Sequence, residues 1–304
     1  MGRALADAFP ICRETFEEAD AALGDSISRL CFEGPAERLT LTENTQPAIL
    51  AVSVAAWRLL ASRGFAPAFV AGHSLGEYSA HVAAGTFSFA DAIRIVRRRG
   101  RYMQEAVPVG AGAMAAILGL DAGRVAQACT EAAQGEVVSP ANMNAPGQIV
   151  IAGARDAVAR AGERARQLGA KRVVGLPVSA PFHCALMKPA EERLAPELRA
   201  LAVSDPRIPV VANVDAEPKR DAAGAIEALV RQVSQPVRWE ESVRRLAAEG
   251  VGAYVELGPG TVLSGLVRKI HRDARVASVE TPDGMTAVEA LFSSAGPGLA
   301  RPAD

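Results

Sequence analysis

The sequence has no long apolar run, no secretion signal and no excess of either charge. No stretch of its 304 residues approaches the roughly 18 consecutive apolar residues that a membrane-spanning helix needs, and the N-terminus lacks a signal-peptide pattern. The formal net charge of −1 gives no electrostatic reason to bind nucleic acid or an anionic membrane. We therefore expect a cytoplasmic protein that binds neither.

Cysteine is also scarce. Cys12, Cys31, Cys129 and Cys184 lie far apart and none belongs to a C-x-x-C motif. This pattern predicts four reduced thiols and no metal site. Hydrophobic residues make up 49% of the chain and charged residues 22%. These fractions indicate a sizeable core, and the length predicts two domains or one large domain with an insertion.

Helix and strand patterns alternate along most of the chain. Residues 69–71 read as a strand that leads through a turn into a helix at about 75–84. Strands at 208–214 and 253–258, with helices between them, continue the alternation. The pattern is typical of an α/β fold with a parallel sheet. Residues 280–304 carry Gly, Pro and Ser and are predicted to form a loose tail.

A different pattern occupies the middle of the chain. A strand, a helix, two strands, a helix and a final strand are predicted at 113–120, 121–133, 136–144, 148–153, 154–170 and 171–178. This βαββαβ order is that of a ferredoxin-like unit. We therefore predict a large α/β domain formed by residues 1–109 and 181–304, with an inserted subdomain at 110–180.

One serine stands at the junction of a predicted strand and helix. Ser74 is flanked by Gly72 and Gly76 in a G-x-S-x-G pattern. Such a pattern can hold a nucleophile on a sharp turn, because glycine has no Cβ to collide there. The backbone N–H of Leu75, at the start of the helix, would then face the developing oxyanion.

A serine nucleophile needs a base, and the chain has four histidines. His73 adjoins Ser74 and should point away from it, while His81 fits a helix surface or a core contact. His271 lies in a charged stretch and reads as a surface residue. His183 follows a strand end where the insertion returns to the large domain, so it is a good candidate, but the residues alone leave the choice open.

Arg99 lies on the apolar side of its predicted helix. Placed at 100° per residue, four arginines share one solvated face, whereas Arg99 falls among apolar residues that include Met103. A buried arginine needs an anion, either an internal carboxylate or the carboxylate of a substrate. Asn142 and Asn144 lie in a Pro- and Gly-rich stretch, where they either form turns or line a cleft.

Six motifs in order closely resemble the malonyl-CoA:acyl carrier protein transacylases of fatty acid and polyketide synthesis. They are GHSLGEYSAHVAAG, RRRGRYMQEAVP, ANMNAPGQIVIAG, VSAPFHCALMKPA, RQVSQPVRW and ELGPGTVLSGL. The resemblance implies a hydrolase-like α/β domain with an inserted ferredoxin-like subdomain. It also implies ping-pong transfer of a malonyl group from malonyl-CoA to the phosphopantetheine thiol of an acyl carrier protein.

The resemblance assigns roles to five residues of the reaction centre. Ser74 is the nucleophile and His183 the general base and acid. The backbone carbonyl of Gln232 orients His183, the Leu75 N–H binds the oxyanion, and Arg99 holds the malonyl carboxylate.

Further residues are expected on the substrate side. Phe182, Met103, Asn142, Asn144 and Val262 are the additional candidates for substrate binding. The bulk of Phe182 would crowd an α-methyl group and disfavour methylmalonyl. We expect no bound cofactor, no metal and a monomer whose partners are the coenzyme A thioester and the carrier protein.

One part of the family pattern is missing from this chain. The family has an N-terminal strand and a GQGSQ-like loop, whose glutamine makes a second oxyanion contact, and neither precedes MGRALADAF here. We expect an exposed sheet edge and a weakened oxyanion site in the chain as given. Two alternatives remain: a serine esterase or thioesterase with His271 as its base, and a truncated carrier-binding relative with impaired catalysis.

Overall fold

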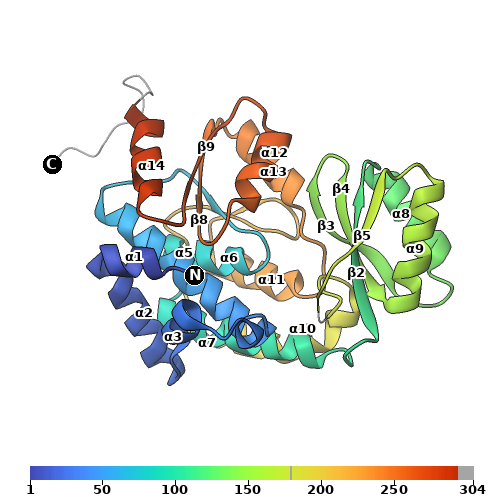
Figure 1. Ribbon diagram of the computed structural model, residues 1–304, viewed down its shortest axis with the longest axis horizontal. Coiled ribbons are helices and arrows are strands. Elements are labelled where there is room, and N and C mark those ends of the chain that lie inside the picture. The colour runs from blue at the N-terminus through green and yellow to red at the C-terminus, as the bar shows by residue number, and fades with distance from the viewer. Residues whose placement is uncertain (179, 294–304) are drawn as a thin grey trace.

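The computed structural model describes residues 1–178 and 180–293. A larger body of helices around short parallel strands lies beside a smaller unit with one four-stranded sheet (Figure 1). The α/β class with an inserted ferredoxin-like unit is confirmed. The boundaries at 110 and 180 stay a prediction, and the four strands of the smaller sheet all fall between them.

The smaller unit follows the predicted βαββαβ order. Its elements are β2 (Gly112–Leu118), α8 (Ala122–Ala132), β3 (Val138–Ala145), β4 (Gln148–Ala154), α9 (Arg155–Gln167) and β5 (Arg172–Gly175). The strands form one antiparallel sheet in the order β3-β4-β2-β5. This is the ferredoxin-like order, in which the first and third strands of the unit are central.

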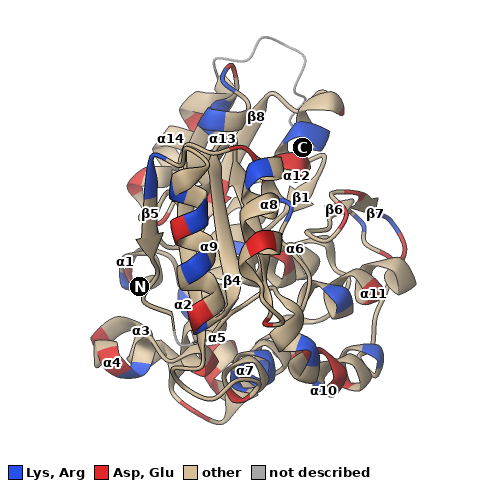
Figure 2. Cartoon of the chain, turned by 90° about the vertical axis from the view of Figure 1, so that its right-hand side faces the viewer, with Lys and Arg blue, Asp and Glu red and all other residues tan. Residues whose placement is uncertain are grey.

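Two amphipathic helices pack on this sheet. Asp121 caps α8 by accepting the Arg124 N–H. Apolar residues of both helices form one buried cluster with Ile117 and Ile151 of the sheet, and each such side chain contributes about 1.5–3 kcal/mol on burial. The outward face of α9 is charged, as Figure 2 shows.

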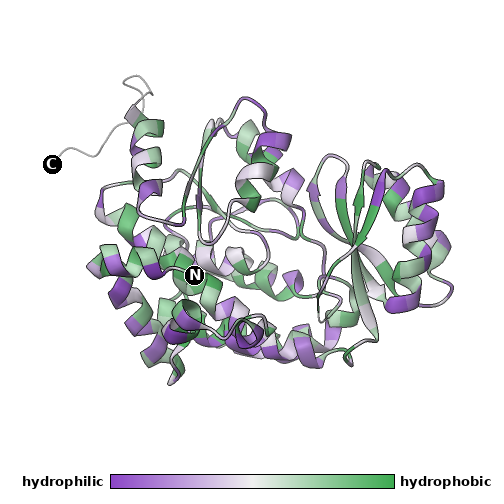
Figure 3. Cartoon of the chain, in the orientation of Figure 1, coloured by the Kyte–Doolittle hydropathy of each residue, from purple (hydrophilic) through white to green (hydrophobic). Residues whose placement is uncertain are grey.

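The larger body contains the remaining elements. Before the insertion these are α1 (Arg3–Ala8), α2 (Pro10–Leu23), α3 (Ile27–Glu33), α4 (Ala36–Leu39), α5 (Thr42–Ser62), β1 (Val70–Ala71), α6 (Leu75–Ala84) and α7 (Phe89–Glu105). After it come the 3-10 turn η1 (Ala185–Met187), α10 (Lys188–Arg199), β6 (Val210–Val211), β7 (Pro218–Lys219), α11 (Ala222–Gln232), α12 (Trp239–Ala248), β8 (Ala253–Leu257), α13 (Val262–Ile270), β9 (Arg275–Val279) and α14 (Asp283–Ser293). The long helix α5 runs through the apolar centre (Figure 3), with Leu50 and Val54 almost completely buried.

The parallel strands of the body form two short sheets. Strand β1 pairs in parallel with β6, whose other neighbour is the antiparallel β7, and β8 pairs in parallel with β9. Among the described residues β1 and β8 each pair with a single strand. The exposed sheet edge expected from the sequence stays a prediction. The predicted loose tail is wrong in its first part, because α14 is helical and buries Met285 and Val288. Residues 294–304 of that tail lie outside the described residues.

Backbone hydrogen bonds join the two units. The N–H of Met143 donates to Val237 O (2.9 Å), and the N–H of Val237 donates to Ala141 O (2.8 Å). Strand β3 is thereby held against the segment that follows α11. None of the helices described is both long enough and apolar enough to cross a membrane.

Close backbone contact between α7 and the start of α5 predicts the effect of a single methyl group. A Cβ on Gly100 would lie 2.6 Å from Thr42 O and 2.7 Å from Glu43 Cα. We expect Gly100→Ala to lower the free energy of unfolding by about 1–3 kcal/mol through overpacking. Gly265 in α13 is the matched control, because nothing lies within 4 Å of its added Cβ.

Gly265→Ala should leave the stability unchanged or raise it by up to about 1 kcal/mol, because alanine favours the helix. Urea unfolding monitored by circular dichroism measures both variants. Equal effects of the two substitutions would show that the contact at Gly100 is not tight.

Candidate active site

Ser74 stands on a strained turn between β1 and α6. Its φ and ψ are 51° and −105°, a conformation that residues with a Cβ rarely adopt. A Cβ on Gly72 would lie 1.9 Å from the backbone carbon of Gly76, so only glycine fits at 72. The expectation for Gly76 is wrong, because nothing lies within 4 Å of a Cβ built there. Of the two glycines, only Gly72 is required by the geometry of the turn.

Asn213, just beyond β6, fixes the backbone of this turn. Its Oδ1 accepts the Ser74 N–H (2.7 Å), and its Nδ2 donates to Gly72 O (2.7 Å). The side chain is fully buried. The sequence motifs assign Asn213 no role, and its only signal is a polar residue near the end of the apolar strand predicted at 208–214.

His183 is the histidine that contacts Ser74. The Ser74 Oγ and His183 Nε2 atoms are 2.7 Å apart, and His183 Nδ1 donates to the backbone carbonyl of Gln232 at 2.9 Å. This second bond leaves Nε2 unprotonated and able to accept the serine proton. Burial, and then the nearby charge of Arg99, lower the pKa of His183 to about 3. The ring is therefore neutral in the free protein.

The other three histidines have different partners. His73 Nε2 lies 2.8 Å from Asn144 Oδ1. His81 is buried against Thr86, and His271 lies 3.1 Å from the hydroxyl of Tyr254. His81 is thus a core contact, the second of the two positions expected for it.

Arg99 is 2% exposed and reaches the nucleophile. Its Nη1 donates to Gln46 Oε1 (2.7 Å), and its Nη2 donates to Ser74 Oγ (3.0 Å) and Gln232 Oε1 (2.9 Å). The guanidinium carbon lies 5.3 Å from the centre of the Tyr78 ring. No carboxylate among the described residues forms an ion pair with Arg99. Of the two anions considered, an internal carboxylate therefore forms no ion pair with Arg99 in the described part of the chain.

The side chain of Gln232 connects these groups. Its Nε2 donates to Ser74 O (2.8 Å) and to Glu77 Oε2 (2.8 Å), while its Oε1 accepts from Arg99. The sequence motifs assign a role only to the backbone carbonyl of Gln232 and none to Gln46 or Glu77. Glu77 lies three residues after Ser74, which was the available signal.

The remaining candidates lie at different depths. Met103 is 1% exposed, and its sulfur lies 3.9 Å from Nε2 of Gln46, the residue whose Oε1 accepts from Arg99. Phe182 is half-buried between two apolar clusters. Asn142 is 7% exposed, whereas Val262, the first residue of α13, is 70% exposed. Substrate contact by these residues stays a prediction.

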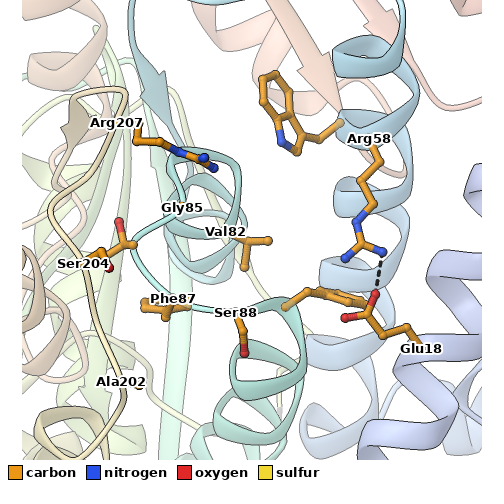
Figure 4. Close-up of a pocket in the computed structure, with 12 residues that line it drawn as sticks. Glu18, Arg58, Val82, Gly85, Phe87, Ser88, Ala202, Ser204 and Arg207 are labelled. Carbon is orange, nitrogen blue, oxygen red and sulfur yellow. Dashed lines mark hydrogen bonds and ion pairs between the residues drawn. The ribbon is translucent and has the colours of Figure 1, made fainter.

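A cavity of about 470 Å³ lies beside the C-terminal end of α6, whereas Ser74 precedes its first residue. Figure 4 draws the residues that line this cavity. Gly85, which ends α6, lines it together with Phe87 and Arg207. Arg58, the second arginine that lines the cavity, is paired with Glu18 at 2.6 Å. The cavity is therefore separate from the Ser74–His183 pair. All four cysteines are free, as predicted, and the structure shows that all four are buried.

The family of the chain follows from comparison with known proteins. The model of the acyl transferase domain matches residues 1–288. The chain belongs to the acyl transferase family. The Ser74–His183 pair thus lies in an acyl transferase, a class of enzyme that forms an acyl-enzyme intermediate on a nucleophile.

Individual relatives of this acyl transferase are close in sequence and structure. The malonyl CoA-acyl carrier protein transacylase of Salmonella typhimurium is 52% identical over 284 residues, 93% of this chain and 92% of the relative. An acyl carrier protein S-malonyltransferase from Vibrio cholerae has a TM-score of 0.93 and 49% identity, covering 95% of this chain and 94% of that one. A malonyl-transacylase in complex with its type II polyketide synthase carrier protein has a TM-score of 0.93 and 48% identity, covering 97% and 95%.

Alanine substitutions of the two glycines around Ser74 should differ in their effect on the stability and reactivity of the acyl transferase. Gly72→Ala should lower the melting temperature and slow labelling of Ser74 by a small phosphonyl fluoride about 100-fold or more, because the turn must move by ångströms. Gly76→Ala, the matched control, should keep the melting temperature of the unaltered protein. Its Ser74 should be labelled at a rate within a few-fold of the unaltered one. Thermal unfolding and mass spectrometry of the labelled protein measure the two variants. Similar losses in both would contradict the steric role of Gly72.

Proposed function

We propose that this acyl transferase moves a malonyl group from malonyl-CoA to the phosphopantetheine thiol of an acyl carrier protein, through an acyl-Ser74 intermediate. The observation that carries the proposal is the buried guanidinium of Arg99, which lies 3.0 Å from the Ser74 oxygen and has no carboxylate partner among the described residues. A cation in this position suits an acyl group that carries its own carboxylate. The names of the relatives agree with that substrate.

In the first half-reaction Ser74 Oγ attacks the thioester carbonyl of malonyl-CoA. The hydroxyl proton passes to His183 Nε2, 2.7 Å away, and the carbonyl oxygen becomes an oxyanion. The N–H of Leu75, the first residue of α6, has no acceptor within the helix and supplies one oxyanion contact. Collapse of the intermediate breaks the C–S bond, and His183 returns the proton to the thiolate of coenzyme A.

In the second half-reaction the thiol of the carrier protein takes the place of the serine. His183 accepts the thiol proton, the sulfur attacks the acyl-Ser74 ester, and the proton returns to Ser74 Oγ as the C–O bond breaks. Both halves need His183 neutral, and its lowered pKa keeps it so at neutral pH.

A neutral group orients the base in this site. The carbonyl of Gln232, 2.9 Å from His183 Nδ1, takes the place that an aspartate has in many serine enzymes. An aspartate there would add a second anion close to the malonyl carboxylate and weaken its binding to Arg99. The neutral carbonyl therefore suits an anionic acyl group.

Phe182 and the four cysteines support two further proposals, on the acyl group that is preferred and on the cellular compartment. The bulk of Phe182, next to the base, disfavours an α-methyl group by about 1–3 kcal/mol. Four free, buried thiols suit a reducing compartment, so we place the reaction in the cytoplasm.

Two histidine variants test the proposed reaction. With labelled malonyl-CoA, His183→Ala should reduce transfer to carrier protein by about 10²–10⁴-fold, because the proton loses its acceptor. His271→Ala should keep it within a few-fold, because His271 hydrogen-bonds Tyr254 and not Ser74. Scintillation counting of the carrier protein and mass spectrometry of Ser74 measure both. Transfer that survives the first change and disappears with the second would favour the esterase alternative.

Arg99→Ala tests the carboxylate clamp. Malonyl acylation should fall about 100-fold or more, because a buried charge-assisted contact is lost. Acetyl acylation should hold or rise, because Arg99 no longer donates to Ser74 Oγ. Quenched-flow acylation with both thioesters measures the ratio. Equal losses for the two acyl groups would assign Arg99 a structural role instead.

A further inference from the structure

Glu77 is a fully buried carboxylate that forms no ion pair among the described residues. Its Oε2 accepts two hydrogen bonds, from Gln232 Nε2 (2.8 Å) and from the N–H of Asn213 (3.0 Å). Its Oε1 is equally buried and has no partner in the described part of the chain. Burial without a cation favours the protonated acid, because the charged form loses its hydration.

The amide of Gln232 lies between this carboxyl group and the guanidinium of Arg99. Arg99 has only donors, so it takes Gln232 Oε1, and the acceptor Glu77 takes Nε2. Reversing the amide would place donor against donor at Arg99. The backbone carbonyl of Ser74 also accepts from Gln232 Nε2 (2.8 Å). Together with that carbonyl, Glu77 therefore fixes the side-chain orientation with which Gln232 holds Arg99.

Few charges other than Arg99 face Glu77. Arg99, from α7, lowers the pKa of Glu77, and Asp215, beyond β6, raises it, although Asp215 is itself paired with Lys219 and Arg231. Burial is the largest influence and raises the pKa of Glu77 to about 7, although the hydrogen bonds from Gln232 and Asn213 lower it.

The other elements against α6 add no opposing charge. β1 contains only Val70 and Ala71, and within α5 Glu43 pairs with Arg101 and Arg58 with Glu18. On α6 itself Tyr78 and His81 are buried and neutral, because burial raises the pKa of Tyr78 to about 12 and lowers that of His81 to about 3.

We propose that Glu77 is a positioning and specificity-determining residue that works as a neutral carboxylic acid. In that form it orients the Gln232 amide and leaves the positive charge of Arg99 uncompensated. Both hydrogen bonds go to Oε2, which leaves Oε1 as the oxygen free to carry the proton. The inference rests on the proposed function, since the anion that matches this charge is the carboxylate of the malonyl group.

The direction in which malonyl acylation of Ser74 changes with pH follows from the net charge of Glu77 and Arg99. Below neutral pH the buried group of Glu77 and Arg99 carries one positive charge, which the malonyl carboxylate neutralises. Above neutral pH the ionised Glu77 cancels that charge, and the malonyl group meets a second anion. Malonyl binding therefore favours the protonated acid, and by linkage malonyl acylation takes up protons near neutral pH. An acetyl group has no carboxylate, so its transfer to Ser74 should not depend on the protonation state of Glu77.

The test measures acylation of Ser74 by malonyl-CoA and acetyl-CoA between pH 5.5 and 8.5. The ratio of the two rates cancels the ionisation of His183, which is common to both. In the unaltered protein the ratio should fall on the order of tenfold as the pH rises. Glu77→Gln, which mimics the neutral acid, should make the ratio independent of pH. Glu14→Gln, at an exposed residue of α2, is the control and should keep the fall.

A second measurement needs no variant. In weakly buffered solution at pH 7.5 the unaltered protein should take up a fraction of a proton with malonyl-CoA and none with acetyl-CoA. A ratio independent of pH in the unaltered protein, a ratio that still falls in Glu77→Gln, or equal proton uptake with both thioesters would overturn the inference. Failure of both thioesters to acylate Ser74 would instead contradict the proposed function.

Discussion

The guanidinium of Arg99 is a buried cation held by neutral oxygens. Gln46, Ser74 and Gln232 accept its hydrogen bonds, and no carboxylate of the described residues pairs with it. A buried charge in this state is costly unless an anion reaches it. Much of the surrounding structure can be understood as the means of keeping this cation beside the nucleophile without neutralising it.

Several elements distant in sequence meet at Gln232. Its backbone carbonyl sets the tautomer of His183, and its amide contacts Arg99 from α7 and Glu77 from α6. The base, the cation and the nucleophile turn are therefore coupled through the backbone and side chain of one residue at the end of α11. Because interacting groups of this kind are not additive, replacing one changes the geometry of the others.

The site also depends on a strained turn. Ser74 keeps its unusual backbone conformation because Asn213 binds the turn from both sides and Gly72 lets α6 approach closely. Such strain persists only where the surrounding contacts over-determine it. The free hydroxyl oxygen is thereby presented to His183 and Arg99 at the N-terminus of a helix, where a developing negative charge is also favoured.

Local patterns in the sequence were sufficient for several features. The G-x-S-x-G turn, the βαββαβ order of the insertion and the position of Arg99 on an apolar helix face follow from steric, periodic and charge arguments that involve neighbouring residues. The motifs then identified the family, which the comparisons confirm. The error over α14 has the same origin, because Gly, Pro and Ser near the end of the chain concealed a helix that packing stabilises.

Only the tertiary structure decided which of four histidines meets Ser74, and that the internal partners of Arg99 are neutral. It also brought Gln46, Glu77 and Asn213 to the site, residues whose local sequence carries no sign of one another. Asn213 and Ser74 are 139 positions apart in the chain, and Gln232 and Glu77 are 155 apart. Hydrogen bonds over such separations depend on how sheets and helices pack, and no local periodicity encodes that arrangement.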